Sequence, residues 1–252
     1  MSLLQTGDLV KQFGGLTAVD HVTLGIERGD VQAIIGPNGA GKTTFINCVS
    51  GLLDPTSGTV EFNGEDITGM PPHETVQLGI SKSFQTASIF PTMTVEENVQ
   101  IAAFGAEHGS FRFNFLKKRS DYDTVHEQTE RMLRSVALWK DRDVEAQNLP
   151  YGDKRRLEIA IALASEPELL FMDEPTAGMS PEETESTVDL IEDLKEDLGL
   201  TIVLVEHDME IIFRVSDRIA VLNRGRIIAD GPPEGVQGDP SVQEAYLGGV
   251  EL

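Results

Sequence analysis

A glycine-rich segment, GPNGAGKT, has the residue types and spacing of a phosphate-binding loop. It lies between a short apolar run at 31–35, typical of a buried strand, and a helical stretch at about 42–50. Backbone N–H groups in such a loop curve around phosphate oxygens, and the helix start attracts anions. Lys42 is expected to neutralise β- and γ-phosphates, and Thr43 to bind Mg²⁺. The predicted nucleotide-binding residues here are Gly36, Pro37, Asn38, Gly39, Ala40, Gly41, Lys42, Thr43 and Thr44.

Two adjacent carboxylates follow a second apolar run, LLFM, at 169–172. An acid at the end of a buried strand is suited to holding Mg²⁺, and a second acid beside it is suited to activating water. We therefore expect Asp173 to be a magnesium ligand and Glu174 to be the general base. Taken alone, the same pair is also typical of a solvated strand end.

These residues require a sheet to position them. The pattern predicts short antiparallel strands in residues 1–35, helices from 94 to 164, and alternating strands and helices after 165. The fold class is therefore α/β, a single 252-residue domain built on a parallel sheet. Residues 1–87 and 166–252 form the nucleotide-binding core with an antiparallel β subdomain, and residues 88–165 form an inserted helical subdomain.

The individual elements follow from apolar periodicity and turn residues. The expected strands are 31–35, 59–62, 80–84, 169–172 and 201–205, with a hairpin at 218–222 and 226–229. The expected helices are 42–50, 95–104, 122–136, 155–164 and 181–198, followed by short helices at the C-terminus.

Composition restricts the partners. The chain has 42 acidic and 20 basic residues, a formal net charge of -22, which repels nucleic acid and anionic lipid. Such a surface indicates either work in high salt, where counterions screen the repulsion, or simply high solubility. We expect no secretory signal and no membrane span. The single cysteine, Cys48, excludes an intrachain disulfide and favours a reducing cytoplasm.

With the phosphate loop and the Asp173–Glu174 pair in place, the chain resembles the ATP-binding cassette (ABC) family over nearly its whole length. The resemblance implies ATP and Mg²⁺ as cofactors. It implies that Gln85 reaches the metal and the water, that His207 contacts the γ-phosphate, and that Phe13 stacks on adenine. The alternative for Phe13 is a core position. Ala177-Gly178-Met179 matches the segment through which two cassettes touch.

The family's signature segment, which caps ATP bound to the opposite subunit, is matched by Leu149, Pro150, Tyr151, Gly152 and Asp153. The family pattern is LSGGQ, or LSYGQ in the nearest branch. Pro150 therefore replaces a serine and Asp153 replaces a glutamine, whereas Gly152 and an arginine-rich stretch after it remain. We expect these changes to weaken capping, because a hydroxyl is lost and a carboxylate is added beside an anionic ligand.

Within the family the chain is most similar to the ATP-binding subunits of branched-chain amino acid importers. The similarity lies in FGGL at 13–16, RRLEIA at 155–160, TAGM at 176–179, EHDM at 206–209 and AYLG at 245–248. It implies multi-span membrane permease subunits, a second ATPase subunit (paralogue or self) and, indirectly, an extracytoplasmic binding protein. It also implies a cytoplasmic location, peripheral on the inner face of the membrane. Cassettes for urea or short amides share much of this pattern.

Two other classes and one local feature stay open. A non-transport ABC ATPase acting in DNA repair or translation usually carries a long coiled coil or two cassettes, and a regulatory module without turnover would not need Glu174 and His207. Residues 104–121 form a longer insert than a minimal cassette needs, with Phe111, Phe113 and Phe115 before the basic run KKR at 117–119. It is either a membrane or partner contact, or a solvated loop with a small aromatic anchor.

Overall fold

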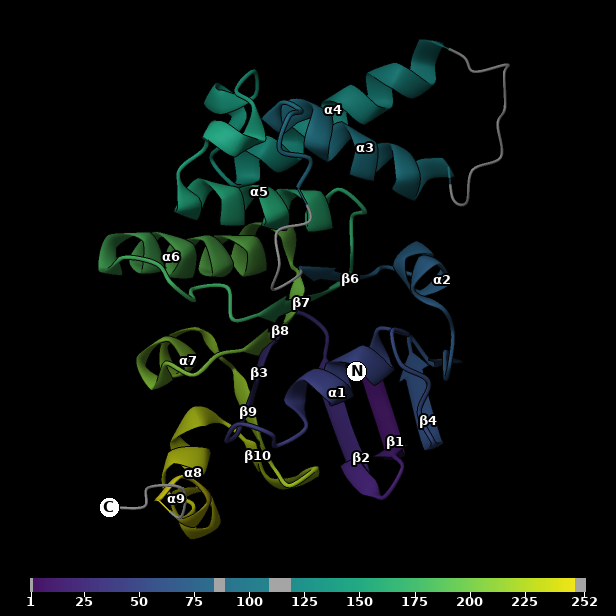
Figure 1. Cartoon of the computed structure of the whole chain (residues 1–252), viewed down its shortest axis with the longest axis vertical. Coiled ribbons are helices and arrows are strands. Elements are labelled where there is room, and N and C mark those ends of the chain that lie inside the picture. The colour runs from purple at the N-terminus through teal and green to yellow at the C-terminus, as the bar shows by residue number, and fades with distance from the viewer. Residues whose placement is uncertain (1, 84–88, 109–118, 248–252) are drawn as a thin grey trace.

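The computed structural model describes residues 2–83, 89–108 and 119–247 (Figure 1). Its centre is a six-stranded sheet in the order β10-β9-β3-β8-β7-β6, in which all neighbours are parallel except β9 and β10. The expected parallel α/β core is confirmed. The strands are β3 (Val31–Ile35), β6 (Ile80–Ser83), β7 (Leu169–Asp173), β8 (Thr201–Val205), β9 (Arg218–Asn223) and β10 (Arg226–Gly231).

A second, antiparallel sheet has the order β2-β1-β4-β5. Its strands are β1 (Ser2–Phe13), β2 (Leu16–Glu27), β4 (Ser57–Phe62) and β5 (Glu65–Asp66). The prediction of short strands in the first 35 residues was wrong in length: β1 and β2 have 12 residues each, joined by a tight turn at Gly14-Gly15. Register shifts along the pair let two long strands stay paired while they twist.

Helix α1 (Lys42–Val49) packs between the two sheets. Phe45 and Ile46 are fully buried in one cluster with Phe171 of β7 and side chains of β1, β2 and β4. Cys48, 2% exposed, belongs to the same cluster. This packing fixes the position of the loop that precedes α1.

Alternate residues of β7 face the two sides of the central sheet, as expected for a strand buried on both faces. Leu169 and Phe171 pack toward α1, and Leu170 and Met172 pack in a second cluster with α3, α4, α5 and α6. The third cluster, around β9, is covered by the C-terminal helices. The helices are α2 (Pro72–Gln77), α3 (Val95–His108), α4 (Arg119–Ser135), α5 (Tyr151–Leu163), α6 (Pro181–Leu198), α7 (Met209–Val215), α8 (Pro233–Gln237) and α9 (Pro240–Leu247), with 3-10 turns at Trp139–Asp141 and Ala146–Asn148.

Three predicted helix boundaries were wrong. Helix α4 begins at Arg119, three residues before the predicted start at Tyr122. Helix α5 begins at Tyr151, four residues before the predicted start. Pro150 is its N-cap residue, and Asp153 lies in its first turn, where the helix dipole favours a carboxylate. Helix α3 continues to His108, beyond the predicted end at Phe104. The aromatic residues at 111, 113 and 115 and the lysines at 117–118 lie outside the described residues. Therefore the role of the 104–121 insert stays a prediction.

Helix α6 has the bounds predicted from the sequence. Ser180 caps it, Pro181 is its first residue, and Glu183 completes a capping box with Ser180. Gly199, with φ 62°, ends it. The helix lies between α5 and α7 (Figure 1).

The predicted hairpin is confirmed as β9 and β10, which flank Arg224-Gly225.

Among the residues that the structure describes, no helix has both the length and the apolar character required to cross a membrane.

Candidate functional site

Two glycines of the phosphate loop lie where backbone from other elements approaches closely. Gly36 has φ 148°, and a Cβ atom there would lie 2.0 Å from the carbonyl oxygen of Leu222. Gly41 has φ 107°, and a Cβ atom there would lie 2.2 Å from the carbonyl oxygen of Ala18. Only glycine tolerates both the dihedral angle and the contact. The loop is thereby held against β9 and β2 at the start of α1.

Lys42 is the first residue of α1 and is 8% exposed. Its Nζ atom donates hydrogen bonds to the carbonyl oxygens of Gly36, at 2.7 Å, and Pro37, at 3.3 Å. Burial lowers the pKa of Lys42, and the carboxylates of Glu174 and Asp173 counteract that shift. The ammonium is therefore held inside the loop, beside the N–H groups of the first helical turn, where an anionic phosphate would be stabilised.

Asp173 ends β7 and is 6% exposed. Burial raises the pKa of Asp173, and the positive charge of Lys82 on the neighbouring strand β6 opposes that shift. Lys82 Nζ also donates to Oδ1 of Asn47 in α1, at 2.9 Å. The sequence analysis did not identify Lys82. The feature that could have pointed to Lys82 is that a lysine lies inside a strand that was otherwise predicted to be buried.

Glu174 is placed by an unusual backbone conformation directly after β7. Its φ is 51°, and its N–H donates to the carbonyl oxygen of Val205 at 2.8 Å. The carboxylate Oε1 lies 3.0 Å from Nε2 of His207. The predicted general base and the predicted γ-phosphate contact thus lie within hydrogen-bond distance of each other, although they come from different strands of the sheet.

Glu206 is a buried carboxylate that the sequence analysis quoted without a role. Its Oε1 accepts hydrogen bonds from Thr176 N–H at 3.0 Å and Thr176 Oγ1 at 2.5 Å, and its Oε2 accepts one from the His207 N–H at 3.1 Å. It therefore ties the segment after Glu174 to the segment that carries His207. The sequence feature that could have pointed to Glu206 is its position as a carboxylate directly after the buried strand β8.

These elements enclose a cleft of about 350 Å³. Phe13 is 46% exposed and lies at its edge, with Lys11 Nζ 5.1 Å from its ring centroid. The alternative that Phe13 is a core residue was wrong. The cleft is lined by Phe13, Leu16, Ala18, Asn38, Gly39, Ala40, Gly41, Lys42, Thr43, Thr44, Asp173, Glu174, Val205 and His207.

The donor set in this cleft suits Mg²⁺ bound with phosphate. Thr43 supplies a hydroxyl oxygen and Asp173 a carboxylate, and both line the same space. Mg²⁺ is usually held by one or two carboxylates together with substrate phosphates and water, so a larger cluster of acids is not required. Gln85, the third predicted metal contact, lies outside the described residues and stays a prediction.

The signature residues 149–153 lie elsewhere, at the start of α5, and do not line the cleft. Tyr151 Oη donates to the carbonyl oxygen of Ala177 at 3.1 Å. The Gly152 N–H donates to Oε1 of Glu183 at 3.2 Å. The first contact ties the start of α5 to the segment before α6, and the second ties it to the first turn of α6.

Comparison with known proteins supports the same identification. The model of the family described as "ABC transporter" matches residues 19–177, and that of "Branched-chain amino acid ATP-binding cassette transporter" matches residues 226–251. The chain is 39% identical to the high-affinity branched-chain amino acid transport ATP-binding protein BraF of Pseudomonas aeruginosa over 254 residues, covering 98% of each chain.

Solved structures agree. An ATP-binding cassette of an ABC transporter in its ADP conformation has a TM-score of 0.86 and 34% identity, with 98% of this chain and 99% of that one covered. A dimeric ATP-binding cassette in a post-hydrolysis state bound to ADP and Pi has a TM-score of 0.76 and 25% identity, with 91% and 98% covered. The family model over residues 19–177 and the relative that matches over 98% of the chain agree with the phosphate loop and the paired carboxylates, and the chain belongs to the ABC transporter family.

Proposed function

We propose that this chain is the ATP-binding and ATP-hydrolysing subunit of an ABC importer that takes up branched-chain or related amino acids. One observation carries the enzymatic part: Lys42, Asp173 and the Glu174–His207 pair line a single cleft. A binding module without turnover would not require a carboxylate and an imidazole held 3.0 Å apart beside a phosphate loop.

The residues divide the work as follows. The loop N–H groups and Lys42 bind the phosphates, and Phe13 stacks on the base. Asp173 and Thr43, with Gln85, would hold Mg²⁺, which neutralises phosphate charge when bound. Glu174 accepts the proton of the attacking water, and His207 orients that carboxylate and donates toward the γ-phosphate oxygens.

The active assembly on this proposal is a head-to-tail pair of cassettes. A nucleotide on one subunit's phosphate loop is capped by residues 149–153 of the other subunit, and closure drives the membrane subunits. The altered signature makes the pair asymmetric, because Pro150 and Asp153 cap poorly. We therefore infer a heterodimer with a paralogous ATPase subunit, in which the partner's signature caps the nucleotide bound at Lys42.

The remaining partners follow from the same assembly. Multi-span permease subunits would dock where the core meets the helical subdomain at 88–165, near residues 86–93, of which 86–88 lie outside the described residues. The chain would then lie in the cytoplasm at the inner face of the membrane, and an extracytoplasmic binding protein would act indirectly. Nucleic acid is disfavoured by the net charge of -22.

Branched-chain amino acids are favoured over urea or short amides by two findings. BraF carries that substrate class in its name, and the C-terminal family model covers β10 and the helices after it. The deciding experiment is calorimetry on the binding protein encoded beside this chain's gene, with leucine, isoleucine, valine, urea and acetamide. Binding of the three amino acids is expected. Binding of urea or acetamide alone would contradict the substrate assignment and leave the ATPase assignment intact.

A further inference from the structure

Helix α5 begins with a backbone N–H that is already bound to a carboxylate. Oε1 of Glu183 accepts from the Gly152 N–H at 3.2 Å, and Oε2 of the same side chain accepts from the Ser180 N–H at 2.8 Å. One carboxylate thus serves the N-termini of two helices, α5 and α6. N–H groups at a helix start have no partner within the helix, so an anion there is stabilising.

The approach of Glu183 depends on the absence of a side chain at position 152. A Cβ atom on Gly152 would lie 2.9 Å from Oε1 of Glu183. Hydrogen bonds from Ser180 and, to a lesser extent, Gly152 lower the pKa of Glu183, so the group is ionised at neutral pH. The glycine that the signature retains therefore admits a negatively charged group of the same chain.

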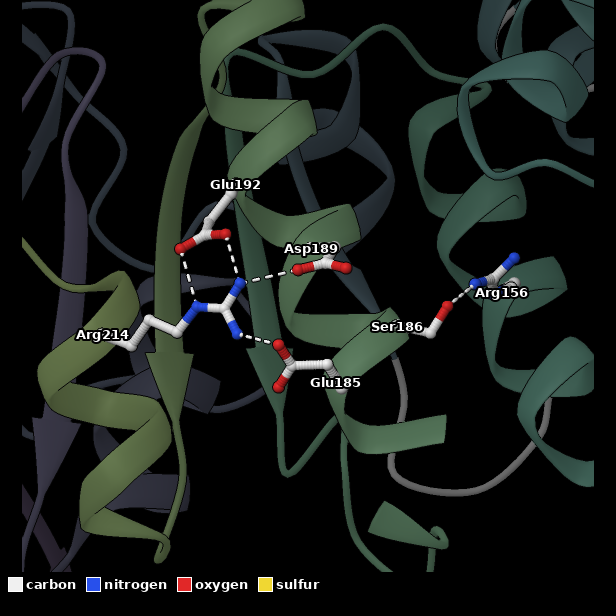
Figure 2. Close-up of polar contacts among 6 residues, drawn as sticks. All are labelled: Arg156, Glu185, Ser186, Asp189, Glu192 and Arg214. Carbon is white, nitrogen blue, oxygen red and sulfur yellow. Dashed lines mark hydrogen bonds and ion pairs between the residues drawn. The ribbon is translucent and has the colours of Figure 1, made fainter. Parts of the chain in front are cut away.

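Helix α6, which carries Glu183, has polar contacts with a neighbouring helix on each of two flanks, and Figure 2 shows these contacts. On one flank Arg214 of α7 binds three carboxylates, at 2.7 Å for Glu185, 2.6 Å for Asp189 and 2.8 Å for Glu192. On the other flank Arg156 of α5 donates to Ser186. The Glu183 carboxylate can leave Gly152 by rotating its own side chain, while Arg214 still ties α6 to α7.

On the head-to-tail dimer proposed above, the partner's γ-phosphate would approach this same end of α5. Two anions cannot share one N–H donor, and like charges at hydrogen-bond distance repel strongly. We propose that Glu183 is an intramolecular competitor of the partner subunit's γ-phosphate for the Gly152 N–H. The side chain sets how much ATP is needed to close the dimer, and it acts without touching the nucleotide bound to its own subunit.

The test uses full-length Glu174→Gln, whose slow hydrolysis keeps ATP intact, with and without Glu183→Gln. Glutamine at this position retains the capping geometry and removes the charge. The dimer fraction is measured by light scattering across a MgATP titration. Glu183→Gln is expected to lower the ATP concentration at half-dimerisation by about two- to fivefold, the range for one charge at a helix terminus. The ATP affinity of the monomer is expected to stay unchanged, and the melting temperature is expected to fall slightly, because the charge stabilises two helix starts. A purely structural cap would predict that fall without any shift of the midpoint.

Two further variants test whether the effect comes from the contact of Glu183 with Gly152 or only from a negative charge near the start of α6. Glu182→Gln makes the same charge change one residue earlier, on an exposed side chain, and is expected to leave the midpoint unchanged. Glu183→Asp keeps the charge but shortens the reach to Gly152, and is expected to lower the midpoint. Equal midpoints for all variants, or equal shifts for Glu182→Gln and Glu183→Gln, would overturn the role of Glu183. Absence of any ATP-dependent dimer in both the Glu174→Gln protein and its Glu183→Gln derivative would also overturn the role of Glu183, because removing the competitor would then not let a second copy close. It would leave the heterodimer with a paralogue unaffected.

Discussion

Two helix N-termini in this protein face opposite situations. At the start of α1, no side chain among the described residues caps the helix, no acidic residue lies in the first turn, and Lys42 adds positive charge. At the start of α5, Asp153 lies in the first turn and Glu183 occupies the Gly152 N–H. The first terminus is therefore open to an external anion, whereas the second is already satisfied by an internal one.

On the proposed dimer, this difference means that one chain can bind its own nucleotide strongly at α1 and still cap the partner's nucleotide weakly at α5. A helix start attracts phosphate only to the extent that the chain leaves it unfilled. On the proposed dimer, the start of α1 would retain that attraction for a bound nucleotide, and the start of α5, which would cap the partner's nucleotide, is already partly filled by Glu183. Predictions that change one terminus or its catalytic neighbours, and not the other, can break this contrast or sharpen it.

The largest effect is expected at the open terminus. We predict that Glu174→Gln lowers steady-state ATP hydrolysis by about 100-fold or more, because the general base is removed. Binding of MgATP is expected to persist, since Lys42 and the loop are unchanged, and an ATP-bound dimer should accumulate. Phosphate release and size-exclusion chromatography measure the two properties. Glu182→Gln is the matched control, and hydrolysis near the unmodified rate in Glu174→Gln would remove Glu174 from its assigned role.

A largely buried ion pair lies one turn further along α5 than the filled terminus. Arg155 Nη1 lies 2.9 Å from Oε2 of Glu158, and burial raises the pKa of Glu158 while Arg155 opposes that shift. We predict that Arg155→Met lowers the free energy of unfolding by about 3 kcal/mol, the cost of leaving one buried charge without its partner. Urea denaturation measures it.

The control for that prediction is the double variant Arg155→Met with Glu158→Leu, which removes both charges. It is expected to recover most of the stability, because replacing a whole buried pair by apolar groups is often neutral. A double variant as unstable as the single one would show that the pair is not what holds this turn of α5.

A smaller effect is expected from repairing the signature itself. We predict that Pro150→Ser with Asp153→Gln raises the ATPase rate of the homodimer at least several-fold. A restored charge-assisted hydrogen bond contributes about 1.5–3 kcal/mol, which in full would be about tenfold or more in rate. Part of that gain is expected to be withheld by Glu183. The control is Pro150→Ala with Asp153→Gln, which lacks the hydroxyl. An unchanged rate with intact ATP binding would show that the natural signature already works as it stands.

The smallest effect concerns the acidic surface around both termini. Helix α6 alone carries eight carboxylates and one lysine. We predict that the melting temperature rises gradually with KCl up to molar concentration, because counterions screen this repulsion. A sucrose series of matched osmolality is the control. A melting temperature that is flat or falls with salt would leave solubility as the sole explanation of the charge.

The sequence allowed α6, β7 and β8 to be predicted well because their signals are local: Ser180 and Pro181 at a helix start, and short apolar runs in buried strands. It did not reveal the contact of Glu183 with Gly152, or the contacts of Arg214 with three carboxylates of α6. Both depend on how α5, α6 and α7 pack, which no short window of sequence contains. The start of α5 was missed because residues 150–153 were interpreted as a motif and not also as helix-start signals.

The interior position of Cys48 has a practical consequence for measuring closure of the dimer. Burial raises the pKa of this thiol to about 11, so almost none of it is thiolate at pH 7, and the thiolate is the form that reacts with maleimide labels. Since Cys48 is the only cysteine in the chain, a cysteine introduced at an exposed position can be labelled selectively without removing the native one. Spectroscopic distance pairs across the two subunits can therefore be built on the otherwise unmodified protein.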